Sequence, residues 1–100
     1  MPANEEVIIK TDNVRARILS LEPGENTAWH YHSEVVDHMF CLYGELLVRL
    51  KETGEEIKLQ PGQRCEVQTG LVHQVVNTGA ARAQYLLIQG VGRYDFNTVV

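Results

Sequence analysis

Hydrophobic and polar residues alternate along most of this chain, and this period of two constrains its fold more than any other feature. In the segment 46–51, for example, Leu46, Val48 and Leu50 would lie on one face of an extended strand and the residues between them on the other. A helical spacing of hydrophobic residues never persists for a dozen residues. The pattern therefore predicts an all-β protein.

Short clusters of turn-forming residues separate the alternating segments. Examples are Gln60-Pro61-Gly62 and Asn77-Thr78-Gly79, where we expect the Asn77 side chain to fix the turn. The predicted strands cover residues 6–10, 14–21, 27–32, 36–43, 45–51, 56–60, 64–69, 73–77 and 82–89. Strands at intervals of about ten residues are typical of a sandwich or a closed barrel.

Length and charge limit the domain organisation and the partners. The 100 residues suffice for one domain, residues 1–100, and are too few for two. The formal net charge of −4 provides no positive field for a nucleic acid. No hydrophobic run approaches the roughly 18 residues of a membrane span, and the N-terminus lacks the pattern of a signal peptide. We therefore expect a cytoplasmic protein without a nucleic-acid or membrane partner.

The four histidines of the chain are concentrated at two places. His30, His32 and His38 are close together in the sequence, and His73 follows in a later predicted strand. Because His30 and His32 are two residues apart, their imidazoles would lie side by side on one face of a strand. Neutral imidazoles are ligands for Zn, Fe, Ni, Cu and Mn. An isolated His-x-His pair, however, is more often two ordinary histidines of a half-exposed strand. The surrounding residues must therefore decide between a metal site and ordinary histidines.

Glycine and carboxylate residues stand at regular spacings from the first histidines. They form a pattern over residues 24–44 that consists of Gly24, His30, His32, Asp37 and Gly44. This pattern resembles the first motif of the cupin superfamily, G-x5-H-x-H-x(3,4)-E-x6-G. Asp37 stands where the family usually has Glu.

A second pattern surrounds the last histidine. It covers residues 62–77 and consists of Gly62, Gln68, Gly70, His73 and Asn77. It resembles the second cupin motif, G-x5-P-x-G-x2-H-x3-N, with Gln68 in place of the usual Pro. Both patterns together match the family in the spacing of every motif position, and only Asp37 and Gln68 differ in identity.

The resemblance implies a double-stranded β-helix, a small jelly-roll barrel formed by a single cupin domain. It also implies that His30, His32, Asp37 and His73 bind one divalent transition metal per protomer, with Fe, Mn, Ni and Zn as candidates. Asp37 is shorter than Glu, and a β-bulge could turn His38 inward instead. Adjacent strand residues face opposite ways, so only one of the two can be the fourth ligand. The spacing to Gly44 favours Asp37.

Cupins include dioxygenases, isomerases, lyases and sugar-binding proteins, so the fold does not select the reaction. We expect a metal-dependent enzyme, a dioxygenase or another oxidoreductase, that acts on a small polar organic molecule. One alternative is a non-catalytic module that binds a metal or a small ligand such as a sugar. Another is a cupin isomerase or lyase, for which Tyr43 and Glu66 are conceivable proton carriers. A structural protein with relic histidines is the third.

Arginines on the predicted strands could bind an anionic substrate. They are Arg15, Arg17, Arg64 and Arg82. A strand arginine is usually solvated, so the sequence gives none of them a role.

The C-terminal segment is too hydrophobic to remain in water. Its large hydrophobic residues are Tyr94, Phe96, Val99 and Val100. We expect this segment to pack on another surface. A small barrel gains stability by burying such residues against a second copy of itself, so the sequence predicts a homodimer.

Overall fold

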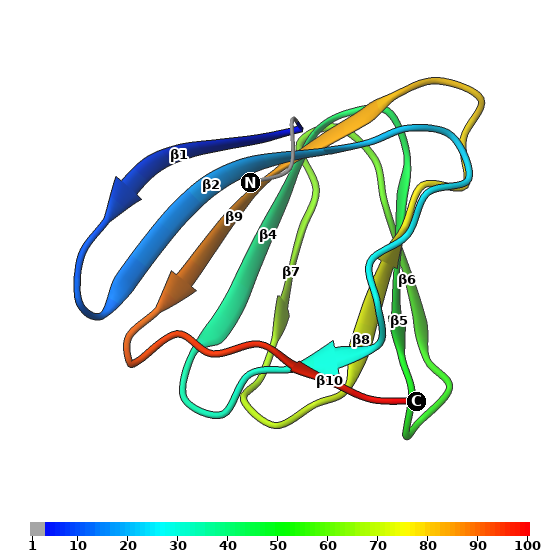
Figure 1. The fold of residues 1–100 in the computed structure, drawn as a ribbon. Coiled ribbons are helices and arrows are strands. Elements are labelled where there is room, and N and C mark those ends of the chain that lie inside the picture. Colours follow the sequence, from blue (N-terminus) through cyan, green and yellow to red (C-terminus); the bar gives the residue numbers. More distant parts are fainter. Residues whose placement is uncertain (1–3) are drawn as a thin grey trace.

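Ten β-strands form two five-stranded sheets in the computed structural model, which describes residues 4–100 (Figure 1). The strands are β1 (Glu5–Lys10), β2 (Val14–Leu21), β3 (His30–Tyr31), β4 (Val36–Tyr43), β5 (Leu46–Leu50), β6 (Glu56–Leu59), β7 (Arg64–Val67), β8 (His73–Val76), β9 (Ala83–Gly90) and β10 (Asn97–Thr98). The first sheet has the order β1-β2-β9-β4-β7 and the second the order β10-β3-β8-β5-β6. All neighbouring strands are antiparallel. Across residues 4–100, no helix is long and apolar enough to cross a membrane.

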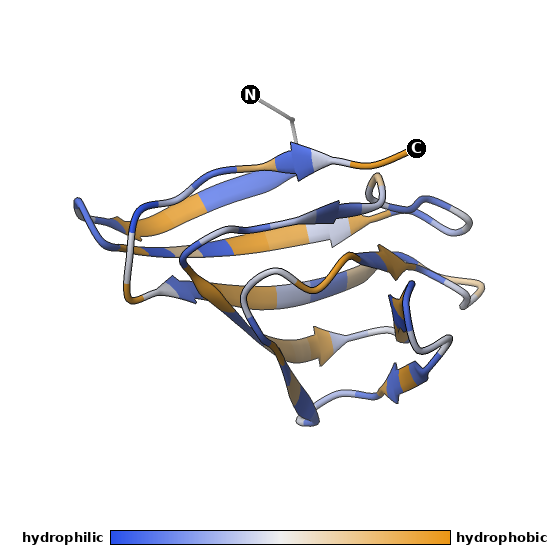
Figure 2. Ribbon diagram, turned by 90° about the horizontal axis from the view of Figure 1, so that it is seen from below, coloured by the Kyte–Doolittle hydropathy of each residue, from blue (hydrophilic) through white to orange (hydrophobic). Residues whose placement is uncertain are grey.

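The hydrophobic core lies between the two sheets. In β5, Leu46 and Val48 are buried, and in β4 so are Met39 and Cys41. These residues alternate with more exposed ones, and Figure 2 shows the resulting change between hydrophobic and hydrophilic positions along the ribbons. The observed all-β jelly-roll barrel confirms the predicted fold class.

The strands lie at their predicted places, and most of their ends differ from the prediction by no more than two residues. The exception is the predicted strand 27–32, of which only His30 and Tyr31 form β3. β2 and β4 belong to the first sheet and β3 to the second, so the chain crosses the barrel twice within a short stretch. The regular pairing of β3 is therefore short, although the Thr27 amide still donates a hydrogen bond to the Val75 carbonyl.

The C-terminal segment folds back onto its own chain. Its residues Asn97 and Thr98 form β10, which the sequence analysis did not predict and which pairs with β3. Tyr94 and Phe96 line a cavity inside the barrel, whereas Val100 is exposed. Phe96 is 47% exposed despite lining this cavity, so the segment packs only partly within its own protomer.

Asn77 fixes a turn, as the sequence predicted. Its side-chain amide donates hydrogen bonds to the carbonyls of Leu21 and Ala81, and its side-chain oxygen accepts one from the Gly79 amide. Asn77 is buried and far from solvent competition. This motif residue therefore has a structural role.

Candidate metal centre

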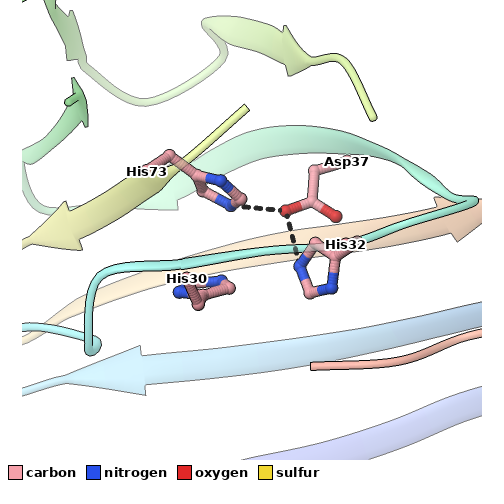
Figure 3. A group of neighbouring side chains, drawn as sticks. All are labelled: His30, His32, Asp37 and His73. Atoms are coloured by element: carbon pink, nitrogen blue, oxygen red, sulfur yellow. Dashed lines mark hydrogen bonds and ion pairs between the residues drawn. The ribbon is translucent and has the colours of Figure 1, made fainter. Parts of the chain in front are cut away.

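The two sheets bring four buried side chains together inside the barrel (Figure 3). His30 of β3 and His73 of β8 are direct neighbours in the second sheet. Asp37 belongs to β4 of the first sheet, and His32 follows β3. The potential ligand atoms of these four residues all lie within 4.8 Å of one another. The fold thus unites the polar residues of both sequence motifs in one place.

Backbone carbonyls hold all three imidazoles by their Nδ1 atoms. The Nδ1–O distances are 2.6 Å from His30 to Ala28, 2.6 Å from His32 to Asp95, and 2.8 Å from His73 to Leu71. A carbonyl oxygen can only accept, so each Nδ1 carries a proton and each Nε2 of a neutral ring keeps its lone pair. Metal-binding histidines are typically fixed in this way.

The lone pairs of two imidazoles face the same carboxylate oxygen. The Nε2 atoms of His73 and His32 lie 2.9 Å and 3.4 Å from Oδ2 of Asp37. In neutral rings these nitrogens are acceptors, and so is the carboxylate oxygen. Either protons or a metal cation must therefore lie between them. Three imidazole nitrogens and one carboxylate oxygen are a donor set that fits a divalent transition metal.

Burial and the charge of Asp37 shift the pKa values at the centre. Burial lowers the pKa of His30 to about 4. Burial also acts to lower the pKa of His32, but the hydrogen bond and charge of Asp37 outweigh it and leave this pKa above its ordinary value. Burial acts to raise the pKa of Asp37, yet hydrogen bonds with His32 and His73 hold it well below its usual range. Asp37 is therefore a carboxylate at neutral pH.

Asp37, and not His38, points into the barrel. The exposed fraction of Asp37 is 1%, whereas His38 lies on the outer face with Nδ1 3.6 Å from a Glu66 carboxylate oxygen. The structure thus places the alternative fourth ligand outside the cluster. Glu66 and Tyr43, the conceivable proton carriers, are exposed and do not line the cavity beside the cluster.

The structure adds two buried residues to the site, Gln89, which the sequence analysis missed, and Arg17, to which it gave no role. Nε2 of Gln89 donates a hydrogen bond of 2.9 Å to Oδ1 of Asp37. Nη2 of Arg17 in turn donates to Oε1 of Gln89 at 2.6 Å, and Nη1 of Arg17 pairs with Glu5 at 3.1 Å. Arg17 is only 8% exposed, so the expectation that its side chain is solvated is wrong. This chain of contacts occupies Oδ1 and leaves Oδ2 of Asp37 facing the histidines.

No spacing rule links Gln89, Arg17 and Asp37, which belong to three different strands. Their contact depends on the strand order β2-β9-β4, which the sequence analysis did not derive. The available signal was alternation, because Gln89 continues the buried positions of β9 after Tyr85 and Leu87. A polar residue at a core position is usually paired with another polar group.

A cavity of about 80 Å³ adjoins the four-residue cluster. Aliphatic residues and the rings of Tyr85, Tyr94 and Phe96 form much of its wall. Phe96 stacks on His30 with ring centroids 4.3 Å apart, and the Tyr94 ring lies 5.6 Å from that of His32. The C-terminal segment therefore completes the wall of the site, which gives a function to hydrophobic residues that the sequence assigned to a dimer interface.

Comparisons with known proteins agree with this architecture. A family model described as the cupin domain matches residues 17–89. The tetracenomycin polyketide synthase protein TcmJ of Streptomyces glaucescens is 32% identical over 66 residues. That alignment covers 66% of this chain and 43% of TcmJ, so the chain matches less than half of this relative's length.

Solved structures show the same fold over most of the chain. A protein with a double-stranded beta-helix domain from Klebsiella pneumoniae superposes with a TM-score of 0.86 at 21% identity, covering 100% of this chain and 90% of that one. The polyketide cyclase RemF from Streptomyces resistomycificus superposes with a TM-score of 0.82 at 19% identity, covering 96% and 70%. At these identities the likeness concerns the fold alone.

Proposed function

The chain belongs to the cupin domain family, and we propose that it is a metal-dependent enzyme acting on a small polar organic molecule. The observation that carries this proposal is the convergence of three carbonyl-anchored imidazoles and one carboxylate beside a cavity. His30, His32 and His73 would bind one divalent ion through Nε2, and Asp37 through Oδ2. Fe, Mn, Ni and Zn all suit this donor set.

Such an ion, when bound, supplies Lewis acidity and, for a redox-active metal, electron transfer to oxygen or substrate. The chain's own residues would position the substrate and limit its contact with water. Tyr94 and Phe96 form part of the cavity wall against the rings of His32 and His30. Tyr85 also lines the cavity, and burial raises the pKa of its hydroxyl, so this group stays protonated at neutral pH. Its hydroxyl is our candidate hydrogen-bond donor to the substrate.

Two reaction classes follow from this site. The first is that of a dioxygenase or another oxidoreductase, as inferred from the cupin motifs. The second is a non-oxidative reaction, such as that of an isomerase, lyase or cyclase, in which the substrate oxygen is polarised. The resemblance to TcmJ and to the polyketide cyclase RemF favours keeping this second candidate.

One experiment separates these classes. Protein loaded with iron, manganese, nickel or zinc is screened against small diketones, phenols, thiols and sugars, with and without oxygen. Turnover coupled to oxygen consumption supports the oxidoreductase, and turnover under nitrogen supports the non-oxidative enzyme. A matched variant, His30→Ala with His32→Ala, should lose either activity. Tight ligand binding without turnover for every metal would contradict the enzyme and support a binding module.

A further inference from the structure

A row of three residues crosses the first sheet at the metal centre. Arg15 of β2 is the direct register partner of Gln89 of β9, and Gln89 is that of Asp37 of β4. Direct partners in antiparallel strands point to the same face, which here is the inside of the barrel. Because neighbouring strands lie about 4.8 Å apart, the Cα atoms of Arg15 and Asp37 are roughly 10 Å apart.

The guanidinium of Arg15 has no ion-pair partner within residues 4–100. Its guanidinium carbon lies 3.8 Å from the centre of the Tyr94 ring, and its Nε is buried without a hydrogen-bond partner. The Nε of the neighbouring Arg17 also lacks a partner, but the terminal nitrogens of Arg17 bind Glu5 and Gln89, whereas no ion pair joins Arg15 to a carboxylate of the described chain. A buried donor without an acceptor destabilises the folded protein. A bound anion would remove this destabilisation.

Arg15 lines a hollow of about 290 Å³ on the other side of Gln89 and Tyr94. Lys10 and Arg93 add two positive charges to this hollow, and Asp12 adds one negative charge. Gln89 and Tyr94 also line the metal cavity, so the two spaces share a wall. The positively charged hollow therefore lies directly beside the metal cavity.

We propose that the substrate is an organic carboxylate, with its carboxylate on Arg15 and its reacting end in the metal cavity. This inference rests on the proposed function, because it uses the same cavity. The planar guanidinium matches a carboxylate, and its stacking on Tyr94 holds it in place before the ligand arrives. A neutral ligand such as a sugar would leave Arg15 unpaired.

The first test does not depend on the metal. Metal-free protein labelled with ¹⁵N is titrated with glutarate, and the Nε–H resonance of Arg15 is followed by NMR and assigned with Arg15→Met. We expect this resonance to shift and saturate, and we expect no comparable shift with glutaramide, the neutral diamide. An Arg15 resonance that glutarate leaves unmoved would overturn the proposal.

The second test asks whether one ligand can contact both the metal and Arg15. Zinc-loaded protein is titrated by calorimetry with the monohydroxamic acids of succinate, glutarate and adipate, and with the same chains ending in a carboxamide. The hydroxamate end binds the metal in each compound, and the chain length varies the reach to Arg15. We expect the best carboxylate compound to bind about tenfold more tightly than its carboxamide, as a charged hydrogen bond would give.

Two variants identify the residue responsible. Arg15→Met keeps an unbranched side chain without the guanidinium and should abolish the preference for the carboxylate. Arg64→Met is the matched control, because Arg64 also lies over an aromatic ring, that of Phe40, but lines neither space. It should keep the preference. Equal affinity of the two compound series in the unmodified protein would overturn the carboxylate proposal. Binding of neither series would contradict the metal site. In that case the glutarate titration would still decide whether Arg15 binds a carboxylate.

Discussion

Each imidazole of the buried four-residue cluster is oriented by a hydrogen bond from its Nδ1 to a backbone carbonyl. Because the carbonyls belong to the strand and loop backbone, the Nε2 atoms are aimed before any ligand binds. Asp37 adds the negative charge that offsets part of the charge of a divalent cation. The site is therefore preorganised, and its affinity for a metal should respond strongly to single residues.

Replacing His30 and His32 together with Ala should abolish stoichiometric metal binding, because two of four ligand atoms disappear. Elemental analysis of the purified protein measures this directly. His38→Ala is the control, since His38 lies outside the cluster near Glu66, and it should keep its metal. Full metal content in the double variant, or loss of metal in His38→Ala, would contradict the assignment of the site.

Gln89 should act on the metal through its hydrogen bond to Asp37 and through its contact with Nε2 of His32, at 2.9 Å and 3.3 Å. Gln89→Leu removes the hydrogen bond to Oδ1 of Asp37 and leaves that oxygen free to rotate toward the metal or to remain unpaired. Loss of a residue that forms a hydrogen bond to a metal ligand typically weakens metal binding by about 10- to 100-fold. Competition with a chelator gives the dissociation constant.

The matched control for Gln89 is Gln84, which lies on the same strand but bonds to Ser20. Gln84→Leu should leave the metal affinity unchanged. If Gln89→Leu weakens thermal stability without changing metal affinity, then Gln89 supports only the fold. Gln89→Glu retains an acceptor but adds a second negative charge beside Asp37. The visible absorption spectrum of the cobalt-loaded Gln89→Glu protein should therefore differ from that of the unmodified protein.

Acid should release the metal, because His32 takes up a proton at low pH. The pKa of His32 is raised above its ordinary value, so at about pH 5 this ring is protonated in the metal-free protein. The proton must leave before Nε2 can bind a metal, and metal affinity therefore falls as the pH decreases from about 7 to about 5. The pKa of His30, about 4, keeps that ring neutral over the same interval. Equal dissociation constants at both pH values would contradict this prediction.

At the scale of elements, the sequence predicted the strands better than the contacts between them. The inward position of Asp37 follows from strand alternation and from the spacing to Gly44, and the structure agrees. The contact of Gln89 with Asp37 could not be predicted, because it depends on the register of β4 against β9. The role of Phe96 was also missed, since β10 has only two residues and follows an irregular segment.

Gly44, at the end of the first motif, joins β4 to β5 and lies beside the first residue of β9. Its φ is +80°, and a Cβ at this position would lie 2.7 Å from the Cα of Ala83. Gly44→Ala should therefore lower the free energy of unfolding by roughly 2–4 kcal/mol, combining backbone strain with overpacking. The midpoint of urea unfolding of the metal-free protein measures this.

Gly54 is the control for Gly44. It has a similar φ of +76°, but a Cβ there would meet nothing within 4 Å. Gly54→Ala should cost only the backbone strain, about 1–2 kcal/mol. Equal destabilisation by the two substitutions would show that the approach of Ala83 does not constrain Gly44.

At the scale of the whole molecule, the barrel leaves one edge of the first sheet with hydrophobic residues exposed. β1 is the last strand of that sheet, and Val7, Ile8 and Ile9 are 43%, 48% and 54% exposed. The pairing of β1 with β2 is irregular between Val7 and Ile9, which are opposite the adjacent residues Arg17 and Ala16 and therefore point to opposite faces, so both faces of β1 at this point lack a cover. Exposed edge strands of this kind favour pairing with another chain.

The C-terminal segment also exposes a hydrophobic residue, because Phe96 is 47% exposed although it lines the cavity. We nevertheless place the interface of the predicted homodimer at β1, where three consecutive exposed hydrophobic residues coincide with a sheet edge. Light scattering at tens of micromolar protein should give the mass of two chains. Ile9→Lys should shift the mass toward one chain, because a charge would be buried in the interface. Val100→Lys, at the exposed C-terminus, should leave the mass unchanged. A single-chain mass for the unmodified protein would contradict the dimer, and dissociation by Val100→Lys alone would place its interface at the C-terminal segment.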